Sequence, residues 1–429
     1  MTSKLAIFGG KPVVDAAVHG RYPIIGLRER ELINKVLDSG ELWGPWAEYT
    51  QQFEQLWADR VGVKYCALLN SGTAALHSGL AGCGIGPNDE VIVPANTFFA
   101  SAAAVLMVGA IPIFVDVQPE TGNIDPSQIE KAISEQTRAI MVVHLHGLPA
   151  DVDSLLEIAK AYKLFLIEDC AQAHGATYCN RQVGSIGDVA AFSLNATKVL
   201  AGAEGGMLTT DSEEIFNRAA RLRVFGTEWR DNELIYRDAD SFGYNFRSNE
   251  FTAALALARA ESLDTEQEWR ISNAKRFIAG ISDLAGVQVP TVPNDRTHIF
   301  QMIRLRLDGS ALGIAMPADL FRERVLAALN AEGADWWTWE TKPLPNFTVF
   351  KTLNADGRGY PWTLSDTRRT MQYKAEDYPV SLATTRDSIF TTSHYPPNQP
   401  SLIDKYIEAF HKVWSSLDEV IELDVTPKS

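Results

Sequence analysis

Ser193-Leu194-Asn195-Ala196-Thr197-Lys198 places a lysine directly after a short apolar run, and Gly202-Ala203-Glu204-Gly205-Gly206 follows it closely. Upstream, the strand-like run Leu164-Phe165-Leu166-Ile167 ends in the acidic pair Glu168-Asp169. In open α/β sheets, ligands bind beyond the carboxyl ends of the strands. Asp169 therefore stands where a ligand is expected.

The combination of Asp169 and Lys198 fits the chemistry of pyridoxal phosphate. The lysine amine forms a Schiff base with the cofactor aldehyde, and the acid keeps the pyridine nitrogen protonated so that the ring can accept an electron pair. A free lysine, with a reference pKa of about 10.4, is a poor nucleophile until its surroundings lower that value. The alternative is a surface lysine and a solvated loop acid, which does not explain the order of these motifs. We predict Lys198 and Asp169 as catalytic residues.

A second motif, Asn70-Ser71-Gly72-Thr73-Ala74-Ala75-Leu76, leaves a strand and opens a helix. Exposed N–H groups and the helix dipole at such an N-terminus bind anions, with the hydroxyl of Ser71 or Thr73 assisting. An ordinary capped helix is the alternative, because serine and threonine are good N-caps. Beside the predicted cofactor pair, a phosphate site is favoured. The nearby run Gly82-Cys83-Gly84-Ile85-Gly86 follows a helix, so it indicates helix termination and not a dinucleotide loop.

Strand-like and helix-like segments alternate over residues 1–250. Apolar runs typical of buried strands lie at residues 90–94, 111–117, 139–144, 164–168, 189–194 and 206–210, with helical patterns between them at 73–81, 100–108, 126–133 and 153–162. Asp125 and Pro126 are expected as the N-cap and first residue of one such helix. The alternation predicts an α/β fold: a three-layer structure with a mainly parallel sheet covered by helices.

After about residue 260 the pattern changes to long polar helices. These helices are predicted at residues 266–281 and 318–331, around a Pro- and Trp-rich stretch, with a final helix at 401–417. A chain of 429 residues exceeds the usual single-domain size. We therefore predict a large domain with an N-terminal arm at residues 1–260 and a smaller α+β domain at residues 261–429.

The amino-acid composition of the chain disfavours some classes of function. Asp and Glu total 54 against 39 Lys and Arg, and the formal charge of −15 disfavours nucleic acid or an anionic membrane as a partner. The four cysteines have neither paired metal spacing nor the density of a disulfide framework, so we expect no metal and reduced thiols in a cytoplasmic protein. The first residues lack a signal-peptide apolar region, and no stretch reaches transmembrane length.

The region from Asn70 to Thr210 resembles the DegT/DnrJ/EryC1/StrS family of pyridoxal phosphate-dependent sugar aminotransferases, within the fold-type I aspartate aminotransferase superfamily. The matching motifs include Asn-Ser-Gly-Thr-Ala-Ala-Leu (70–76), Val-Pro-Ala-Asn-Thr-Phe-Phe-Ala-Ser (93–101), Glu-Asp-Cys-Ala-Gln-Ala-His-Gly-Ala (168–176), Thr-Lys (197–198) and Glu-Gly-Gly (204–206). Gly-Tyr-Asn-Phe-Arg (243–247) also fits. The resemblance covers most of residues 30–265 and implies the large domain of fold type I.

The resemblance implies a role for each matching position. Lys198 would carry the cofactor and shuttle protons, and Asp169 would pair with the pyridinium nitrogen. The other cofactor contacts would be Gln172 to the ring hydroxyl, Phe98 stacked on the pyridine face, and Gly72, Thr73 and Ser193 around the phosphate. Members of this family act as dimers with shared active sites, so Asn245 would reach the phosphate in the neighbouring subunit of a homodimer.

The implied activity is transfer of an amino group from glutamate or glutamine to a keto sugar or cyclitol, with pyridoxamine phosphate as the intermediate form of the cofactor. Such reactions serve amino-sugar, aminocyclitol or antibiotic biosynthesis. Relatives with histidine at the lysine position deoxygenate sugars, so Lys198 favours transamination. The alternatives are another reaction of the same cofactor on a sugar, such as elimination or dehydration, and a non-enzymatic ligand sensor. Fold alone does not choose among them.

The C-terminal third departs from the family pattern. Thr341-Lys342-Pro343-Leu344-Pro345 stands where a Tyr-x-Pro-Leu-His-like segment is expected, and Ser393-His394-Tyr395-Pro396-Pro397 replaces a Leu-Pro-x-His/Tyr-Pro signature. Val199 follows the lysine where many members have asparagine. These differences favour an acceptor without a nucleotide: a cyclitol ketone of the inosose type, an unactivated keto sugar or an aminoshikimate-type ring.

Candidate acceptor residues are aromatic or polar groups that suit hydroxyls and carboxylates. They are Trp43, Trp46, His146, Arg247 and His394. Core tryptophans and a structural ion pair of the arginine are the alternatives. The three tryptophans Trp336, Trp337 and Trp339 match neither a helical stripe nor a carbohydrate platform, so they receive no role.

Overall fold

The structure is a computed structural model of the chain. It describes residues 4–227, 229–230, 233–234, 239, 241–364 and 371–425. Within these residues, no helix combines the length and apolar character needed to cross a membrane.

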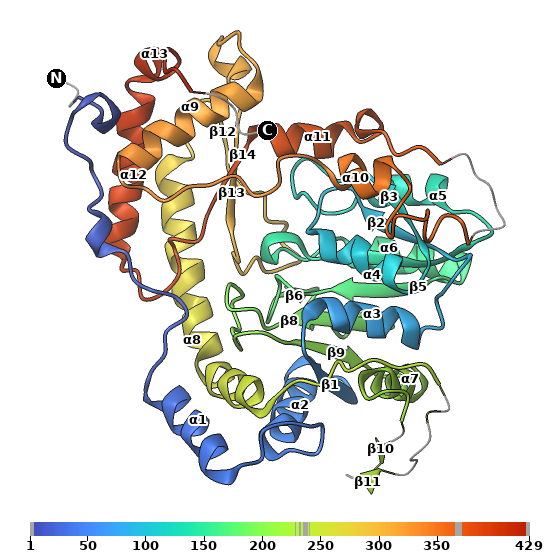
Figure 1. Cartoon of the computed structure of the whole chain (residues 1–429). Helices are drawn as coiled ribbons and strands as arrows, with labels where there is room; N and C mark the ends of the chain where they lie inside the picture. Colours follow the sequence, from blue (N-terminus) through green and yellow to red (C-terminus); the bar gives the residue numbers. More distant parts are fainter. Residues whose placement is uncertain are drawn as a thin grey trace.

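A seven-stranded sheet forms the centre of the larger unit, in the order β1-β9-β8-β5-β4-β2-β3 (Figure 1). Its strands are β1 (Tyr65–Leu69), β2 (Glu90–Pro94), β3 (Ile111–Val115), β4 (Thr137–Val143), β5 (Phe165–Asp169), β8 (Val189–Ser193) and β9 (Gly206–Thr210). Strand β9 runs antiparallel to both β1 and β8, while β8, β5, β4, β2 and β3 are mutually parallel. The predicted mainly parallel sheet is confirmed.

Helices cover both faces of this sheet, as predicted (Figure 1). Because side chains alternate along a strand, Val91 and Val93 of β2 join one apolar cluster and Ile92 joins the other. One face carries α3 (Gly72–Gly82), α4 (Phe99–Met107) and α7 (Glu213–Arg223). The other carries α2 (Glu48–Val61), α6 (Val152–Tyr162) and the first part of α8 (Glu250–Ile281). Burial on both faces explains the continuous apolar runs.

A smaller unit surrounds the antiparallel sheet β12-β13-β14. Its elements are β12 (Val287–Gln288), β13 (Ile303–Leu307), β14 (Ser388–Thr391), α9 (Ala318–Ala331), α11 (Pro379–Asp387), α12 (Pro400–Trp414) and α13 (Leu417–Val420). Phe277, Trp336 and Phe410 lie in its core, together with Leu5 and Val14 from the N-terminal segment.

The helix α8 continues without interruption across the predicted domain boundary at residue 260. Residues 344–364 and 371–373 return to the large sheet, where Leu344, Phe350 and Tyr373 pack in the same cluster as Phe114. The division into residues 1–260 and 261–429 stays a prediction.

The remaining helices and strands are short or peripheral. They are α1 (Leu27–Ser39), α5 (Ile129–Ala132), α10 (Thr348–Lys351), β6 (Thr177–Tyr178), β7 (Arg181–Gln182), β10 (Trp229–Arg230), β11 (Glu233–Leu234) and the 3₁₀ turns Ala6–Phe8, Ala16–Val18, Pro126–Gln128, Leu145–Gly147, Ser310–Leu312, Leu344–Asn346 and Ala375–Asp377. The Asp125 side chain caps Pro126–Gln128, as expected.

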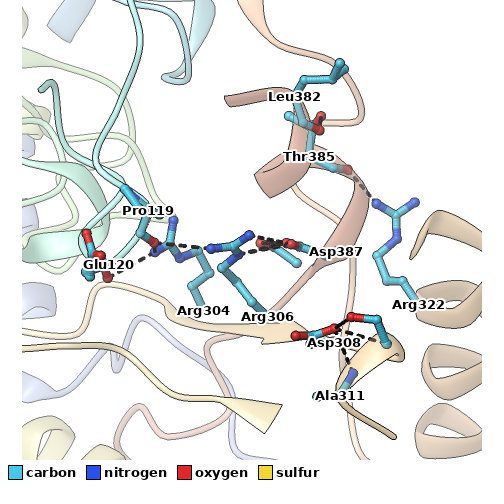
Figure 2. Close-up of polar contacts among 12 residues, drawn as sticks. Pro119, Glu120, Arg304, Arg306, Asp308, Ala311, Arg322, Leu382, Thr385 and Asp387 are labelled. Carbon is cyan, nitrogen blue, oxygen red and sulfur yellow. Dashed lines mark hydrogen bonds and ion pairs between the residues drawn. The ribbon is translucent and has the colours of Figure 1, made fainter. Parts of the chain in front are cut away.

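Two arginines of β13 connect the two units (Figure 2). Arg304 donates through Nη2 to the backbone oxygens of Pro119 and Glu120, at 3.4 Å each. Arg306 donates through Nη1 to the Pro119 oxygen at 3.5 Å, and within the small unit it forms a paired contact with Asp387 at 2.7–3.1 Å. These contacts hold the loop that follows β3 against the small sheet.

Candidate active site

A cavity of about 610 Å³ lies at the carboxyl ends of the parallel strands and is closed on its other side by the small unit. Its lining includes the following residues predicted to hold the cofactor: Gly72, Thr73, Phe98, Asp169, Gln172, Ser193 and Lys198. Tyr22 of the N-terminal segment also contributes, as do Gln301, Met302, Trp337, Trp339, Thr392 and Tyr395 of the C-terminal part. Segments distant in the sequence therefore meet at one site.

Asp169 is the last residue of β5 and is almost fully buried in the cavity wall. Its Oδ2 accepts a hydrogen bond from Ser101 Oγ at 2.7 Å, and its Oδ1 accepts from the Ala171 N–H at 3.1 Å. Burial raises the pKa of the carboxyl above its ordinary value, while these hydrogen bonds and the charge of Lys198 act in the opposite direction. A buried carboxylate is stabilised by a cationic partner, and a protonated pyridine nitrogen would supply one.

Glu168 points to the opposite side of β5 because side chains alternate along a strand. It accepts hydrogen bonds from the backbone of Gly184, Ile186 and Gly187 at 2.7–2.9 Å. Its Oε2 also lies 3.0 Å from His144 Nε2. The Ala150 N–H donates to His144 Nδ1, so the ring proton lies on Nε2 and is donated to Glu168.

The pair of His144 and Glu168 belongs to a group of three side chains with metal-ligand chemistry. His144, Glu168 and Cys170 bring ligand-type atoms within 4.8 Å of one another. Both ring nitrogens of His144 and both oxygens of Glu168 already make hydrogen bonds inside the protein. The cluster therefore supports the strand end that carries Asp169.

Lys198 lies in the loop after β8, on the cavity wall. Burial lowers the pKa of its amine, and the charge of Asp169 partly opposes that effect. The backbone of the loop is held by Tyr22, whose hydroxyl donates to the Val199 oxygen at 2.7 Å. A lowered pKa increases the unprotonated fraction of the amine, which is the nucleophilic form.

The N-terminus of α3 forms a cradle for an anion. Ser71 caps the helix by accepting from the Ala74 N–H at 3.0 Å, which leaves the first turn at Gly72 and Thr73 facing the cavity. A Cβ at Gly72 would lie 2.9 Å from Ser193 Cβ, and one at Gly206 would lie 2.3 Å from the Ser71 oxygen. Both glycines therefore permit the close approach that creates the cradle.

Gln172 is oriented by the backbone of His146. The His146 N–H donates to Gln172 Oε1 at 2.7 Å, so the amide nitrogen remains available as a donor. Phe98 is 54% exposed although it lies in the cavity wall, so a face of its ring is open to a ligand. A buried acid, an amine, an anion cradle and an open aromatic ring together fit a phosphorylated pyridine cofactor.

The predicted acceptor residues lie outside the lining of this cavity. His146 is buried, has a positive φ of 57°, and packs its ring against Trp339 and Phe390. His394 is in the core, with its Nε2 donating to the Phe300 oxygen at 2.7 Å. Neither imidazole faces the cavity of this protomer.

Trp43 and Arg247 form a separate surface feature. The Arg247 guanidinium lies 4.4 Å from the Trp43 ring centroid and 5.2 Å from that of Phe225. Trp43 also packs edge-on against Trp46 at 4.7 Å. Asn245 is exposed nearby, and its backbone oxygen accepts from Asn70 Nδ2. These residues do not line the cavity.

Sequence reasoning missed the tryptophans of the small unit. Trp337 and Trp339 line the cavity, whereas Trp336 is 2% exposed and lies in the small core. Sequence reasoning assigned these residues no role, and the structure places two of them in the lining of the cavity. The missed signal was a strand-like period of two, which places residues 337 and 339 on one side and residue 336 on the other.

The fold and the cavity define a class: a pyridoxal phosphate-dependent aminotransferase. The family model of the DegT/DnrJ/EryC1/StrS aminotransferase family matches residues 23–371, and the chain belongs to that family. This confirms the resemblance seen in the sequence motifs, together with the cofactor.

Relatives that are named for different activities are similar to this chain. L-glutamine:scyllo-inosose aminotransferase of Streptomyces griseus is 37% identical, over 77% of this chain and 80% of that protein. GDP-perosamine synthase of Caulobacter vibrioides is 36% identical, over 73% of this chain and 81% of that protein. The solved structure of an aminotransferase from Psychrobacter cryohalolentis is 28% identical, with a TM-score of 0.81, over 93% of this chain and all of that one (100%). Sugar aminotransferase function is thus supported from both sequence and structure.

Proposed function

We propose that the protein transfers an amino group from L-glutamine or L-glutamate to the ketone of an unactivated cyclitol ring of the inosose type. The observation that carries this choice is the charge of the cavity. Among the described residues that line it, Lys198 is the only one with a cationic side chain, and Asp169 and Glu204 are acidic. An uncharged polyol ring fits such a lining.

A nucleotide-linked sugar would bring a diphosphate into the site. Proteins bind phosphates with arginine, lysine or helix N-termini. Here the α3 N-terminus is assigned to the cofactor phosphate, and Lys198 is assigned to catalysis. The similarity to an L-glutamine:scyllo-inosose aminotransferase supports the same acceptor class and favours glutamine as donor.

The cofactor, when bound, supplies an electron sink and carries the amino group between the two substrates. Asp169 would hold the pyridine nitrogen, Phe98 would fix the ring plane, and Gln172 would donate to the ring hydroxyl. Gly72, Thr73 and Ser193 would bind the phosphate. The Lys198 amine would remove the proton from the donor Cα and, in the acceptor half, deliver a proton to the carbon that receives the nitrogen, because it is a lining amine whose pKa is lowered by burial.

The proposal includes a cytoplasmic homodimer. Asn245 is exposed outside the cavity of its own protomer, which suits a role in the site of the neighbouring subunit. Arg247, two residues later, would then meet a donor carboxylate there. Trp43, Phe225 and Phe242 are 48%, 49% and 74% exposed and offer apolar surface for the same contact. Aminocyclitol formation for an antibiotic is the pathway class that fits this acceptor.

A second candidate acceptor is a nucleotide-linked keto sugar, favoured by the similarity to a GDP-perosamine synthase. An acceptor panel separates the two. The holoenzyme is incubated with L-glutamine and scyllo-inosose, 2-deoxy-scyllo-inosose, an unactivated keto hexose or a nucleotide-linked 4-keto sugar, and products are identified by mass. We expect amination of the cyclitol ketones. Amination of nucleotide sugars alone would contradict the proposal, and a dehydrated product without nitrogen would indicate elimination.

A further inference from the structure

The segment after α9 extends the small sheet. Trp337 donates its N–H to the Phe390 oxygen at 3.0 Å and accepts the Phe390 N–H at 2.9 Å, so it pairs antiparallel with β14. In such an extended segment alternate side chains face opposite ways. Trp336 packs against Phe277 and Phe410 in the small core, while Trp337 and Trp339 face the cavity.

Trp339 is held in place by aromatic neighbours. Its ring centroid lies 5.0 Å from that of His146 in an edge-on contact and 6.1 Å from that of Phe390. Burial lowers the pKa of His146 well below its ordinary value, so the imidazole is neutral and acts as an apolar support. The His146 backbone also orients Gln172. One residue therefore contacts both a predicted cofactor residue and Trp339.

The part of the small unit that lines the cavity carries an unpartnered polar group. Gln301 lines the cavity and is 3% exposed, and its Oε1 has no hydrogen-bond partner among the described residues. A buried acceptor without a partner is costly. Since Oε1 itself is buried, the Gln301 side chain would turn toward the cavity to meet a ligand hydroxyl. Thr392 and Tyr395, which also belong to the small unit, add hydroxyl groups to the cavity lining.

We propose that Trp337 and Trp339 form the platform on which the ring of the amino acceptor stacks, with Gln301 accepting a hydrogen bond from one of its hydroxyls. The face of an indole ring is negatively polarised and large, so it attracts the C–H face of an uncharged polyol ring without requiring a charge. The pair is specificity-determining: it selects an uncharged, unphosphorylated cyclic ketone and acts in the acceptor half of the reaction. This inference rests on the proposed function and assigns residues to its acceptor step.

The test separates the two half-reactions of the holoenzyme. The donor half is followed by the absorbance change of the cofactor on adding L-glutamine, and the acceptor half by the reverse change when a cyclitol ketone is added to the aminated enzyme. For Trp337→Ala and Trp339→Ala we expect kcat/KM for the acceptor half to fall at least about tenfold, and the donor half to fall by less than about threefold. Gln301→Leu should weaken the same half-reaction.

Conservative and distant variants serve as controls. Trp339→Phe keeps an aromatic face and should retain more acceptor activity than Trp339→Ala. A purely structural role of Trp339 does not predict this difference when both variants are well folded. Trp414→Ala removes an indole that hydrogen-bonds to the Ala285 oxygen, remote from the cavity lining, and should leave both halves unchanged. Equal loss of both halves in Trp337→Ala and Trp339→Ala, or loss of neither, overturns the platform.

Failure of the proposed acceptor is distinguishable from failure of the platform. If the unmodified enzyme aminates only a nucleotide-linked ketone, the proposed function fails, and the claim that the platform selects an unphosphorylated ring fails with it. If the unmodified enzyme aminates cyclitol ketones but the tryptophan variants keep their acceptor kinetics, only the platform fails.

Discussion

At Asp169, burial and hydrogen bonding act on one carboxylate in opposite directions. The carboxylate is satisfied by Ser101 and Ala171 on its protein side, yet burial still raises its pKa. A cationic partner in the cavity would keep it ionised. Lys198 supplies part of that charge, and a protonated ligand would supply the rest.

Replacing Asp169 should separate its charge from its hydrogen bonds. Asp169→Asn has nearly the same shape but no charge, so we expect kcat to fall by about 100-fold or more, since one preorganised charge at a reacting ring is lost. Ser101→Ala removes only the 2.7 Å hydrogen bond and should cost less than about tenfold. Steady-state kinetics with saturating cofactor measures both. Equal effects would show that the charge is unimportant.

His77 makes a pH-dependent contribution to stability. It is 3% exposed, packs edge-on against Tyr244 and Phe246, and burial lowers its pKa to about 4. Its unfolded pKa is about 6.5, so the unfolded state binds the extra proton first and stability is lost as pH falls from about 6.5 to 4. The phenyl side chain of the His77→Phe variant cannot bind this proton in either state. We expect the variant to gain about 2 kcal/mol relative to the natural protein between pH 7.5 and 5.

Urea unfolding of both proteins at the two pH values measures that gain, because other titrating groups are common to both. A difference in unfolding free energy that does not change with pH would contradict the burial of a neutral imidazole at this position.

At the scale of elements, the N-terminus of α3 depends on a missing side chain. A Cβ at Gly72 would lie 2.9 Å from Ser193 Cβ, so Gly72→Ala must displace β8 or the helix, at a cost of about 1–3 kcal/mol. We expect weaker cofactor binding, by about tenfold, measured by equilibrium dialysis. Gly86→Ala is a matched control, because its Cβ would meet nothing closer than 3.8 Å. Unchanged affinity in Gly72→Ala would mean that the phosphate does not bind here.

The elements of the large unit were predictable because burial on both faces of a parallel sheet leaves continuous apolar runs such as residues 90–94. Strand ends were less accurate: the predicted strand at 111–117 ends at Val115. The predicted helix at 266–281 is only the second half of α8, because the segment before it is rich in alanine and carries no stop signal before Ile281. The predicted helix 401–417 ends at Trp414, because the chain turns at Ser415 and Ser416 before α13 begins.

The sequence predicted the cavity-lining residues that belong to motifs with a fixed backbone conformation. It was less successful in loops, where the sequence does not show which side chain faces the cavity. Gly72, Asp169 and Lys198 all line the cavity. His394 and Tyr395 are neighbours in the sequence, yet only the tyrosine lines the cavity, while the histidine turns to the Phe300 oxygen. That choice depends on packing between distant segments, which no local pattern encodes.

At the scale of the whole molecule, the cavity lies between the large unit and the small unit. The large unit supplies the residues proposed to hold the cofactor, and the small unit supplies Trp337 and Trp339. The contacts of Arg304 and Arg306 with Pro119 hold the loop after β3 to the small sheet (Figure 2). The relative position of the two units is therefore set by residues outside the cavity. A second copy of the chain is proposed to complete the site with Asn245.

Mixing two inactive variants tests that shared site. Asn245→Ala damages the residue proposed to act in the neighbouring subunit, and Lys198→Ala damages the amine in its own. After subunit exchange, random pairing of a symmetric dimer should give about one intact site in four. Activity of the mixture above that of either variant alone is expected. No recovery despite exchange, verified by mass-tagged subunits, would contradict the shared site.

The most direct measurement is the absorbance spectrum of the purified protein with pyridoxal phosphate, before and after L-glutamine, with Lys198→Ala alongside. We expect the visible band of the lysine-bound cofactor in the natural protein, its loss on adding L-glutamine and the rise of the pyridoxamine band, with no lysine-bound band in the variant. The same band in Lys198→Ala, or none in the natural protein, would contradict the central claim that Lys198 and Asp169 form an aminotransferase site.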